Sequence, residues 1–385
     1  MDVSRPLALL GGLSPEQFMR RHWQRKPLLV RQAWPGVRSP LDRAALFAVA
    51  AQDGVESRLL SRFDGRWRLR HGPFSRRQLP AMARADWTLL VQGLDLHDDA
   101  ARAILSAFRF VADARLDDLM LSWASDGGGV GPHLDSYDVF LLQVQGRRRW
   151  RIGPVADAGL VPGLPVRILA NFEPDQEWLL EPGDMLYLPP SWGHDGVAEG
   201  ECMTCSIGFR AAEARTLAQE LLHQIAAELD PDNDVPDARP RLYRDAGQTA
   251  TARPGELPAG LRDFAQTALR RALDDPRAID RALGCLMTEP KPRVWFDAGR
   301  APEPGSALRL DRRSRMAYDA RHVFINGEAF VASGRDAALM RQLADERTLP
   351  AAAWRRLGAG ARALVEQWCL SGWLRCEAGQ GGAAP

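Results

Sequence analysis

A histidine and an acid two residues apart open the stretch GPHLDSYDVFLLQVQGRRRW, which runs from Gly131 to Trp150. Side chains alternate along a strand, so His133 and Asp135 share one face if the strand is regular from its start. On that face they could bind a single metal ion. The pattern His-x-Asp often occurs by chance, and an ordinary surface pair is the alternative until a third ligand is found.

A second segment, EPGDMLYLPPSWGH, offers that third ligand at its last residue, His194. Its pattern is a tight turn, a short strand and a proline-stiffened loop. Strands far apart in sequence can be neighbours in a barrel, so we expect His194 to meet His133 and Asp135. Two imidazoles and one carboxylate form the facial triad of non-haem Fe(II) oxygenases, and a zinc hydrolase would also accept this set. The ligands alone do not choose between these chemistries.

The arginine run favours one of them. In residues 147–152, alternation places Arg148, Trp150 and Ile152 on one face and leaves the other three arginines on a solvated face. A guanidinium among core residues is costly unless a carboxylate pairs with it. That carboxylate could be an internal Asp or Glu. We favour a dicarboxylate cosubstrate that reaches from the metal to Arg148.

Candidate substrate contacts lie on an expected strand over residues 117–124 and just after the first two ligands. Asp118 and Met120 share one face of that strand. An acid at the mouth of the pocket suits a cationic substrate, although Asp118 could equally be an ordinary surface acid at a strand end. Tyr137 could flank the substrate or simply pack.

The elements that position these residues are mostly short strands. The chain has 385 residues, 45% of them hydrophobic, which predicts two or three domains. A capped helix is expected over residues 14–24 and another near 97–110. Strands separated by Gly- and Pro-rich turns predict an antiparallel barrel or sandwich. They are expected at residues 27–31, 87–92, 118–124, 137–144, 147–152, 185–188 and 203–209.

After about residue 212 the hydrophobic residues recur with the period of a helix. We expect a catalytic domain over residues 1–212, a helical region over 213–300 and a winged-helix-like domain over 301–385. In the last part, strands are expected at residues 308–310, 322–325 and 373–376, with helices at 336–345 and 360–371.

Composition excludes several function classes. The formal net charge is +1, so no global charge points to a polyanion or an anionic membrane. No segment is apolar for long enough to cross a bilayer. Five cysteines, and a start without a signal peptide's apolar run, predict a reducing cytoplasm.

Three stretches resemble the JmjC-type ribosomal oxygenases: GGGVGPHLDSYDVFLLQVQGRRRW, EPGDMLYLPPSWGHDG and FMRRHWQRKPLLVRQ. The likeness covers nearly the whole chain. It implies an α+β chain with a JmjC (cupin) double-stranded β-helix, or jelly roll, a helical dimerisation region that makes a homodimer, and a C-terminal winged-helix-like domain.

The same resemblance implies a site and a reaction. Fe(II) would be held by His133, Asp135 and His194, and 2-oxoglutarate would chelate it with its far carboxylate on Arg148. With O2 as the second cosubstrate, the enzyme would hydroxylate an arginine side chain of the large-subunit ribosomal protein L-sixteen.

Two other functions stay open. The same iron centre could serve a histidine hydroxylase or an N-methyl demethylase. A ligand-sensing cupin fused to a DNA-binding winged helix is the non-enzyme alternative. Residues 301–385 hold twelve Arg against nine Asp and Glu, a net charge of +3. This positive charge is small for a domain that binds a DNA groove, so we do not expect DNA binding.

Overall fold

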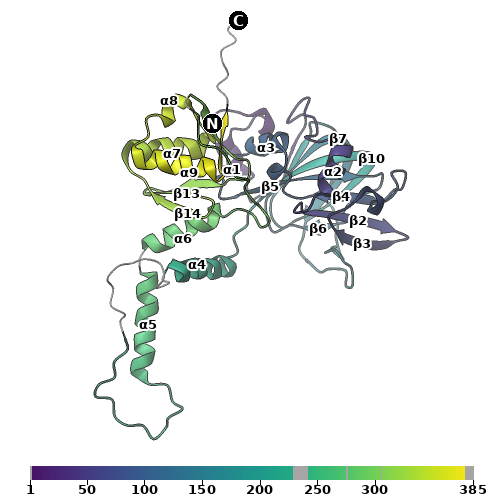
Figure 1. Ribbon diagram of the computed structural model, residues 1–385. Coiled ribbons are helices and arrows are strands. Elements are labelled where there is room, and N and C mark those ends of the chain that lie inside the picture. Colours follow the sequence, from purple (N-terminus) through teal and green to yellow (C-terminus); the bar gives the residue numbers. More distant parts are fainter. Residues whose placement is uncertain (1, 229–241, 275, 304, 378–385) are drawn as a thin grey trace. The chain divides into compact units, whose positions relative to one another are not determined.

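The computed structural model describes residues 2–228, 242–274, 276–303 and 305–377 (Figure 1). The chain divides into two compact units, residues 1–211 and 212–385. The expected further boundary near residue 300 stays a prediction. The segment PDNDVPDARPR (residues 231–241), whose Pro- and Asp-rich composition predicts a connection between helices, lies outside the described residues.

Unit 1 is built around a ten-stranded antiparallel sheet in its described part. The order is β1-β9-β7-β10-β5-β4-β2-β3, with β6 paired to β10 and β8 paired to β7. The strands are β1 (Leu28–Val30), β2 (Ser57–Phe63), β3 (Arg66–His71), β4 (Trp87–Val91), β5 (Leu116–Ala124), β6 (His133–Leu134), β7 (Val139–Pro154), β8 (Gln176–Leu180), β9 (Met185–Leu188) and β10 (Trp192–Phe209). The α-helices are α1 (Pro15–Arg21), α2 (Arg43–Ala50) and α3 (Asp99–Ser106), and the 3-10 turns are Ala8–Leu10, Arg76–Gln78 and Leu94–Leu96.

The core of unit 1 lies on the face of β5 that alternation predicts. Leu119, Leu121 and Trp123 are buried in the main cluster. Trp123 packs on Trp87 of β4 with ring centroids 4.4 Å apart. The expected first helix is also confirmed: Ser14 caps α1, and Gln17 completes the capping box. Aromatic burial of this kind supplies most of the packing that fixes the sheet.

Several expected strands have different bounds. The runs at 137–144 and 147–152 are one continuous strand, β7, and the run at 203–209 is the end of the longer β10. The hairpin β2–β3 was missed, although Asp64–Gly65 at its turn, both with positive φ, is a strong hairpin signal. Its strand Arg66–His71 is arginine-rich and largely exposed, so it lacks a hydrophobic pattern.

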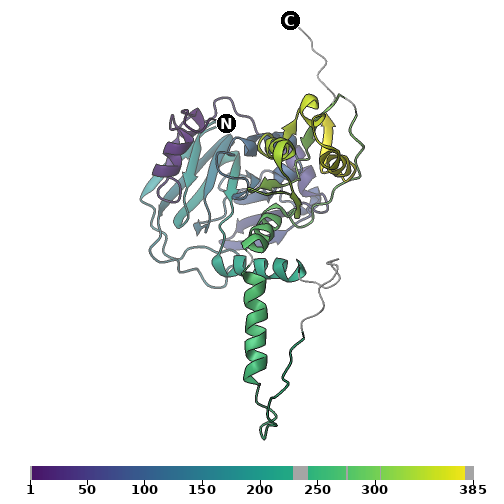
Figure 2. The same ribbon diagram turned by 90° about the vertical axis from the view of Figure 1, so that its left-hand side faces the viewer.

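The described part of unit 2 begins with the helices α4 to α6, and it continues with two three-stranded sheets whose strands alternate with the helices α7 to α9 (Figure 2). Its strands pair in the orders β15-β11-β16 and β12-β13-β14. The helices are α4 (Ala214–Glu228), α5 (Ala259–Leu273), α6 (Pro276–Thr288), α7 (Gly334–Glu346), α8 (Ala351–Trp354) and α9 (Ala359–Leu370). The strands are β11 (Ala307–Leu310), β12 (Met316–Tyr318), β13 (His322–Ile325), β14 (Glu328–Val331), β15 (Thr348–Leu349) and β16 (Leu374–Glu377).

Helix α6 packs against the strands β12, β13 and β14. A Cβ on Gly284 would lie 2.2 Å from the Phe324 ring, so only glycine lets that ring sit against the helix. A helix that was assigned from sequence to the middle region therefore packs with the C-terminal strands. Across the residues described, no helix has the length and apolar character needed to cross a membrane.

Candidate metal centre

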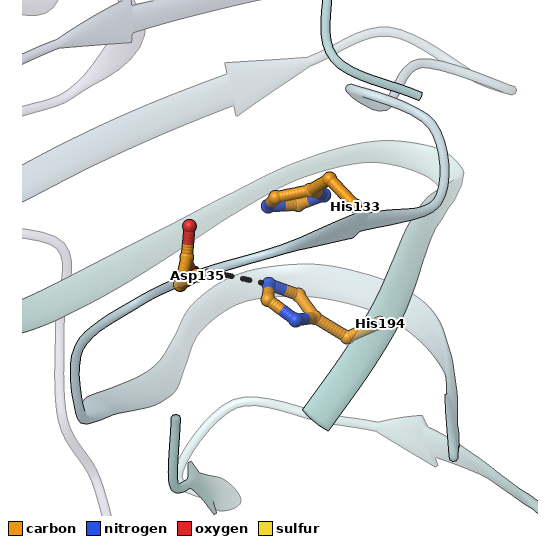
Figure 3. Close-up of side chains that lie close together, drawn as sticks. All are labelled: His133, Asp135 and His194. Atoms are coloured by element: carbon orange, nitrogen blue, oxygen red, sulfur yellow. Dashed lines mark ion pairs between the residues drawn. The ribbon is translucent and has the colours of Figure 1, made fainter. Parts of the chain in front are cut away.

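The pairing of β6 with β10 brings the two histidines together. His133 and His194 are register partners in this antiparallel pair, and their ring centroids are 4.1 Å apart. Asp135 Oδ2 lies 3.6 Å from His194 Nε2. One possible ligand atom from each of the three residues lies within 4.8 Å of the others. Figure 3 shows the three side chains converging, His133 and Asp135 from one segment and His194 from its neighbour. The expected meeting of the three residues is confirmed.

Each histidine ring is oriented by a backbone carbonyl. Nδ1 of His133 lies 2.9 Å from the oxygen of Gly131, and Nδ1 of His194 lies 3.1 Å from that of Trp192. A carbonyl only accepts, so each Nδ1 carries the proton and donates it. This leaves the Nε2 lone pair of each ring free to bind a metal, as in histidine metal sites generally.

Burial keeps His194 neutral. Its side chain is almost fully enclosed. Removal from water, and then the neighbouring His133 ring, lower its pKa to about 4, although the Asp135 carboxylate acts in the opposite direction. A neutral imidazole is the form that coordinates metals. The ring is therefore a competent ligand at neutral pH.

A turn, and not a regular strand, places Asp135. The shared face of His133 and Asp135 was expected on the condition that the strand is regular from its start, and this condition is not met, because β6 ends at Leu134 and β7 begins at Val139. The turn between them is anchored by the buried carboxylate of Asp138. Tyr187 Oη donates to Asp138 Oδ1 at 2.5 Å, and Gln24 Nε2 donates to Oδ2 at 3.2 Å. Burial and the bond to Asp138 raise the pKa of Tyr187, so its hydroxyl stays a donor.

Arg148 lies on the same sheet face as His194. In β7 and β10, His194 is opposite Ile152 and Ala198 is opposite Arg148. Opposite residues of an antiparallel pair share a face, and residues two apart on a strand share it too. The ring of Trp150, between Arg148 and Ile152, accordingly lies 5.9 Å from the His194 ring, between centroids. The three potential metal ligands and the Arg148 guanidinium therefore lie on the same side of the sheet.

Arg148 is buried at 5% exposure, and its Nε and Nη2 atoms have no hydrogen-bond partner among the described residues. Its neighbours behave differently. Arg149 pairs with Glu177 and Glu199, and Arg151 pairs with Asp195. The predicted division of the run into an inward face and a solvated face is confirmed. No internal Asp or Glu of the described chain forms an ion pair with Arg148, so the guanidinium is available to an external carboxylate.

Asp118 is a buried acid, with 3% exposure, which excludes the alternative of a surface acid. Gln92 Nε2 and the Gly93 backbone N–H donate to its Oδ2 at 2.6 and 2.8 Å. Opposite Asp118 in the sheet is Gly208, where an added Cβ would lie 3.4 Å from Asp118 Oδ1.

Tyr137 and Met120 lie near Asp118. The same Cβ on Gly208 would lie 3.9 Å from the Tyr137 ring, and Arg58 Nη2 is 3.8 Å from Met120 Sδ. Partial burial, and then the carboxylates of Asp135 and Asp118, raise the pKa of Tyr137, so its hydroxyl stays protonated. Sequence reasoning missed Arg58. It lies on the missed strand β2 and joins this group by donating to Gln92 at 2.8 Å.

Two family models match the chain. The model described as "JmjC domain" matches residues 103–217, which include all three clustered side chains and Arg148. The model described as "ROXA-like winged helix" matches residues 271–375. The chain is 38% identical over 229 residues to the ribosomal protein uL16 3-hydroxylase of Escherichia coli (strain K12). The chain therefore contains a JmjC domain, and it is similar in sequence and in structure to ribosomal oxygenases. The predicted JmjC jelly roll and C-terminal winged helix are thereby confirmed.

The match to that E. coli relative covers 57% of this chain and 60% of the relative. A probable ribosomal oxygenase of Haemophilus influenzae is 35% identical, over 51% of this chain and 50% of its own length. The sequence matches thus span about half to three fifths of these relatives. The structural match to the family is longer. The X-ray structure of E. coli ycfD has a TM-score of 0.81 at 28% identity, covering 94% of this chain and 98% of that chain. Another structure, of YcfD with cobalt and 2-oxoglutarate, has a TM-score of 0.77, with 95% and 99% covered.

Proposed function

We propose that this chain is an Fe(II)- and 2-oxoglutarate-dependent protein hydroxylase that acts on an arginine side chain of ribosomal protein uL16. The observation that carries the proposal is the buried guanidinium of Arg148, whose Nε and Nη2 have no hydrogen-bond partner in the described part of the chain, on the same sheet face as the His133, Asp135 and His194 cluster. A zinc hydrolase would use the three ligands but would have no use for that guanidinium.

The residues fit the metal and the cosubstrate. Two neutral imidazole nitrogens and a carboxylate on one side of an ion are the donor set of non-haem Fe(II) sites with open positions. The Cα atoms of Arg148 and Ile152, the residue opposite His194, are about 13 Å apart by the rise of a strand. An arginine side chain and a five-carbon dicarboxylate together can fill such a span. The solved YcfD complex with cobalt and 2-oxoglutarate supports this arrangement by analogy.

When bound, ferrous ion with 2-oxoglutarate and O2 supplies an oxidative decarboxylation that yields succinate, CO2 and a hydroxylated C–H bond. The protein's own part is placement and exclusion of water. Arg148 holds the far carboxylate with charge-assisted hydrogen bonds. Trp150, 4% exposed, separates that pair from solvent and packs against His194.

The substrate side of the site suits a cation. Asp118 is a buried acid, and Gln92 Nε2 and the Gly93 N–H hold its carboxylate in place. A buried carboxylate held in this way favours a guanidinium partner through paired hydrogen bonds. Tyr137 and Met120 would flank its aliphatic part. The uL16 hydroxylase activity named for the E. coli relative agrees with this choice.

The test is mass spectrometry of ribosomal protein uL16 after incubation with the enzyme, Fe(II), ascorbate and 2-oxoglutarate. The expected product carries one added oxygen on a single arginine. His194→Ala should abolish the addition, and His223→Ala, an exposed histidine of α4, should leave it unchanged. Oxygen on a histidine, or loss of a methyl group, would replace the arginine assignment by one of the two alternative reactions. Binding of duplex DNA without any turnover of 2-oxoglutarate would instead favour a ligand-sensing cupin fused to a DNA-binding winged helix.

We further propose a cytoplasmic homodimer formed through the helices of residues 213–300. Helix α5 has no buried side chain, and Leu261 and Leu269 are 39% and 60% exposed. Figures 1 and 2 both show α5 standing apart from α4 and α6 along most of its length. An amphipathic helix with exposed leucines is stabilised by a partner helix.

A further inference from the structure

Residues 62–84, which cover the end of β2, the strand β3 and the loop before β4, carry a strong local charge. They hold seven Arg against one Asp, a net charge of +6, which leaves the rest of the chain with a net charge of −5. Such an asymmetry indicates a local contact with an anionic partner. Because β3 is the last strand of the sheet, we call the exposed arginines of this segment the basic edge. They are Arg66, Arg68, Arg70, Arg76, Arg77 and Arg84.

No acid of the described chain forms an ion pair with the basic edge. Within the segment, only Arg62 has an acidic partner, Asp86 at 3.4 Å. Arg70 and Arg76 donate to backbone carbonyls at 2.9 and 3.4 Å, and these hydrogen bonds leave the charges in place. The basic edge therefore keeps a positive potential that attracts an anion.

The pleat of β3 places three of these arginines in a row. Arg66, Arg68 and Arg70 are exposed and alternate with the partly buried Trp67 and Leu69. Successive arginines on that face are about 6.7 Å apart by the rise of a strand. A regular row of cations suits a partner whose negative charges also repeat along a chain.

Aromatic rings extend this row and hold its guanidinium groups. Phe63 is opposite Arg66 in the hairpin, and the Arg84 guanidinium lies 3.4 Å from the centre of the Phe63 ring. The Arg70 guanidinium lies 5.5 Å from the centre of the Phe74 ring. A guanidinium stacked on a ring keeps N–H groups at its edge for hydrogen bonds. Because the ring restricts the side chain, less conformational entropy is lost when a partner binds.

The other face of β3 reaches the candidate metal centre. A Cβ added to Gly131 would lie 3.1 Å from Trp67 Cζ2, so the Trp67 ring packs against Gly131. The Gly131 carbonyl in turn accepts from His133 Nδ1 at 2.9 Å. A partner on the basic edge is therefore held close to the proposed hydroxylase site.

We propose that the basic edge binds the phosphate backbone of RNA. Repeating phosphates match the row of cations, and guanidinium groups pair with phosphate oxygens in bidentate geometry. The choice of RNA among polyanions rests on the proposed function, because ribosomal RNA is the polyanion with which a ribosomal protein associates. An anionic membrane fits less well, since residues 62–84 expose no large apolar side chain that could anchor in lipid.

The test is fluorescence anisotropy of the full-length protein with a labelled single-stranded RNA of mixed sequence, over a range of salt concentrations. We expect saturable binding that weakens as salt rises. Arg66→Gln/Arg68→Gln should lower the affinity at low salt by at least about tenfold. The slope of log K against log salt should become shallower by about 1.4, since each phosphate contact of a single strand contributes about 0.7.

Both substituted side chains are exposed, so their loss leaves the core intact. If the double variant nevertheless fails to fold, Arg68→Gln alone decides, with a slope that is shallower by about 0.7. An unchanged slope in the folded variant would overturn the proposal.

Arg20→Gln/Arg21→Gln is the matched control, because it removes two exposed arginines of α1. This helix packs through Phe18 on Tyr187 of β9, near the opposite edge of the sheet. The control should bind RNA as the unmodified protein does. The proposal fails if no RNA binds at low salt, or if the control loses as much affinity as the double variant. Tighter binding of polyglutamate, or of vesicles that contain phosphatidylserine, would also overturn it.

RNA binding and hydroxylation can fail separately. His194→Ala should bind RNA like the unmodified protein, and Arg66→Gln/Arg68→Gln should hydroxylate free uL16 at an unchanged rate. Hydroxylation of uL16 by a protein that binds no RNA would remove the RNA contact alone. Arginines on an edge strand can also serve only to prevent aggregation. In that case the double variant would aggregate and still bind RNA, which would contradict the proposal.

Discussion

At the scale of single residues, the proposed role of Arg148 is to hold the far carboxylate of 2-oxoglutarate. Arg148→Gln removes the charge and the bidentate geometry. Each charge-assisted hydrogen bond contributes roughly 1.5–3 kcal/mol, so the KM for 2-oxoglutarate should rise about 10- to 100-fold. Fe(II) affinity should stay the same, because no metal ligand changes. Steady-state kinetics and Fe(II) titration measure the two effects.

The control for this variant is Arg151→Gln, whose arginine pairs with Asp195 on the other face of β7. Arg151→Gln should leave the KM for 2-oxoglutarate unchanged.

If the role of Arg148 were structural, the Arg148→Gln variant would be less stable than the unmodified protein. The proposed role predicts the opposite in the absence of 2-oxoglutarate, since an unpaired buried cation is costly. Loss of stability in urea with an unchanged KM would contradict the assignment.

At the scale of elements, the turn between β6 and β7 determines where Asp135 lies. Tyr187→Phe removes the 2.5 Å hydrogen bond to the fully buried Asp138 carboxylate. Leaving a buried acceptor with fewer donors costs about 1–3 kcal/mol in the free energy of unfolding. Because the turn then loosens, Fe(II) affinity should also fall several-fold. Chemical denaturation and metal titration check the two effects.

Tyr318→Phe provides the comparison, since Tyr318 is 40% exposed and donates to the exposed Asp345. Loss of the hydrogen bond between Tyr318 and Asp345 should change the free energy of unfolding by less than about 0.5 kcal/mol. If both variants were equally stable, the turn would not depend on the Asp138 anchor.

At the scale of the whole molecule, the exposed leucines of α5 test the proposed homodimer. Leu261→Glu/Leu269→Glu places two charges on the apolar face, so sedimentation should show a monomer at concentrations where the unmodified chain is dimeric. Gln266→Glu adds a charge elsewhere on the same helix and should remain dimeric. A monomeric unmodified chain would remove the dimer from the proposal and leave the hydroxylase site as it is.

The residue types and local periodicity of the sequence determined much of this protein. Alternation in residues 147–152 separated Arg148 from Arg149 and Arg151, because a strand's two faces differ in their access to water. The capping box at Ser14 was readable because its bonds span only three residues. The three motif stretches carried the resemblance to the JmjC-type ribosomal oxygenases, and the JmjC domain is confirmed.

Tertiary structure alone decided the rest. The turn at Asp135 depends on Tyr187, 49 residues beyond its partner Asp138, so no local pattern in the ligand segment reveals it. Arg58 lies on β2 and Gln92 follows β4, and the order of the sheet joins them to Asp118, because Arg58 donates to Gln92 and Gln92 donates to Asp118. Long-range pairing placed these groups together, because the burial that favours it depends on the whole sheet and not on neighbouring residues.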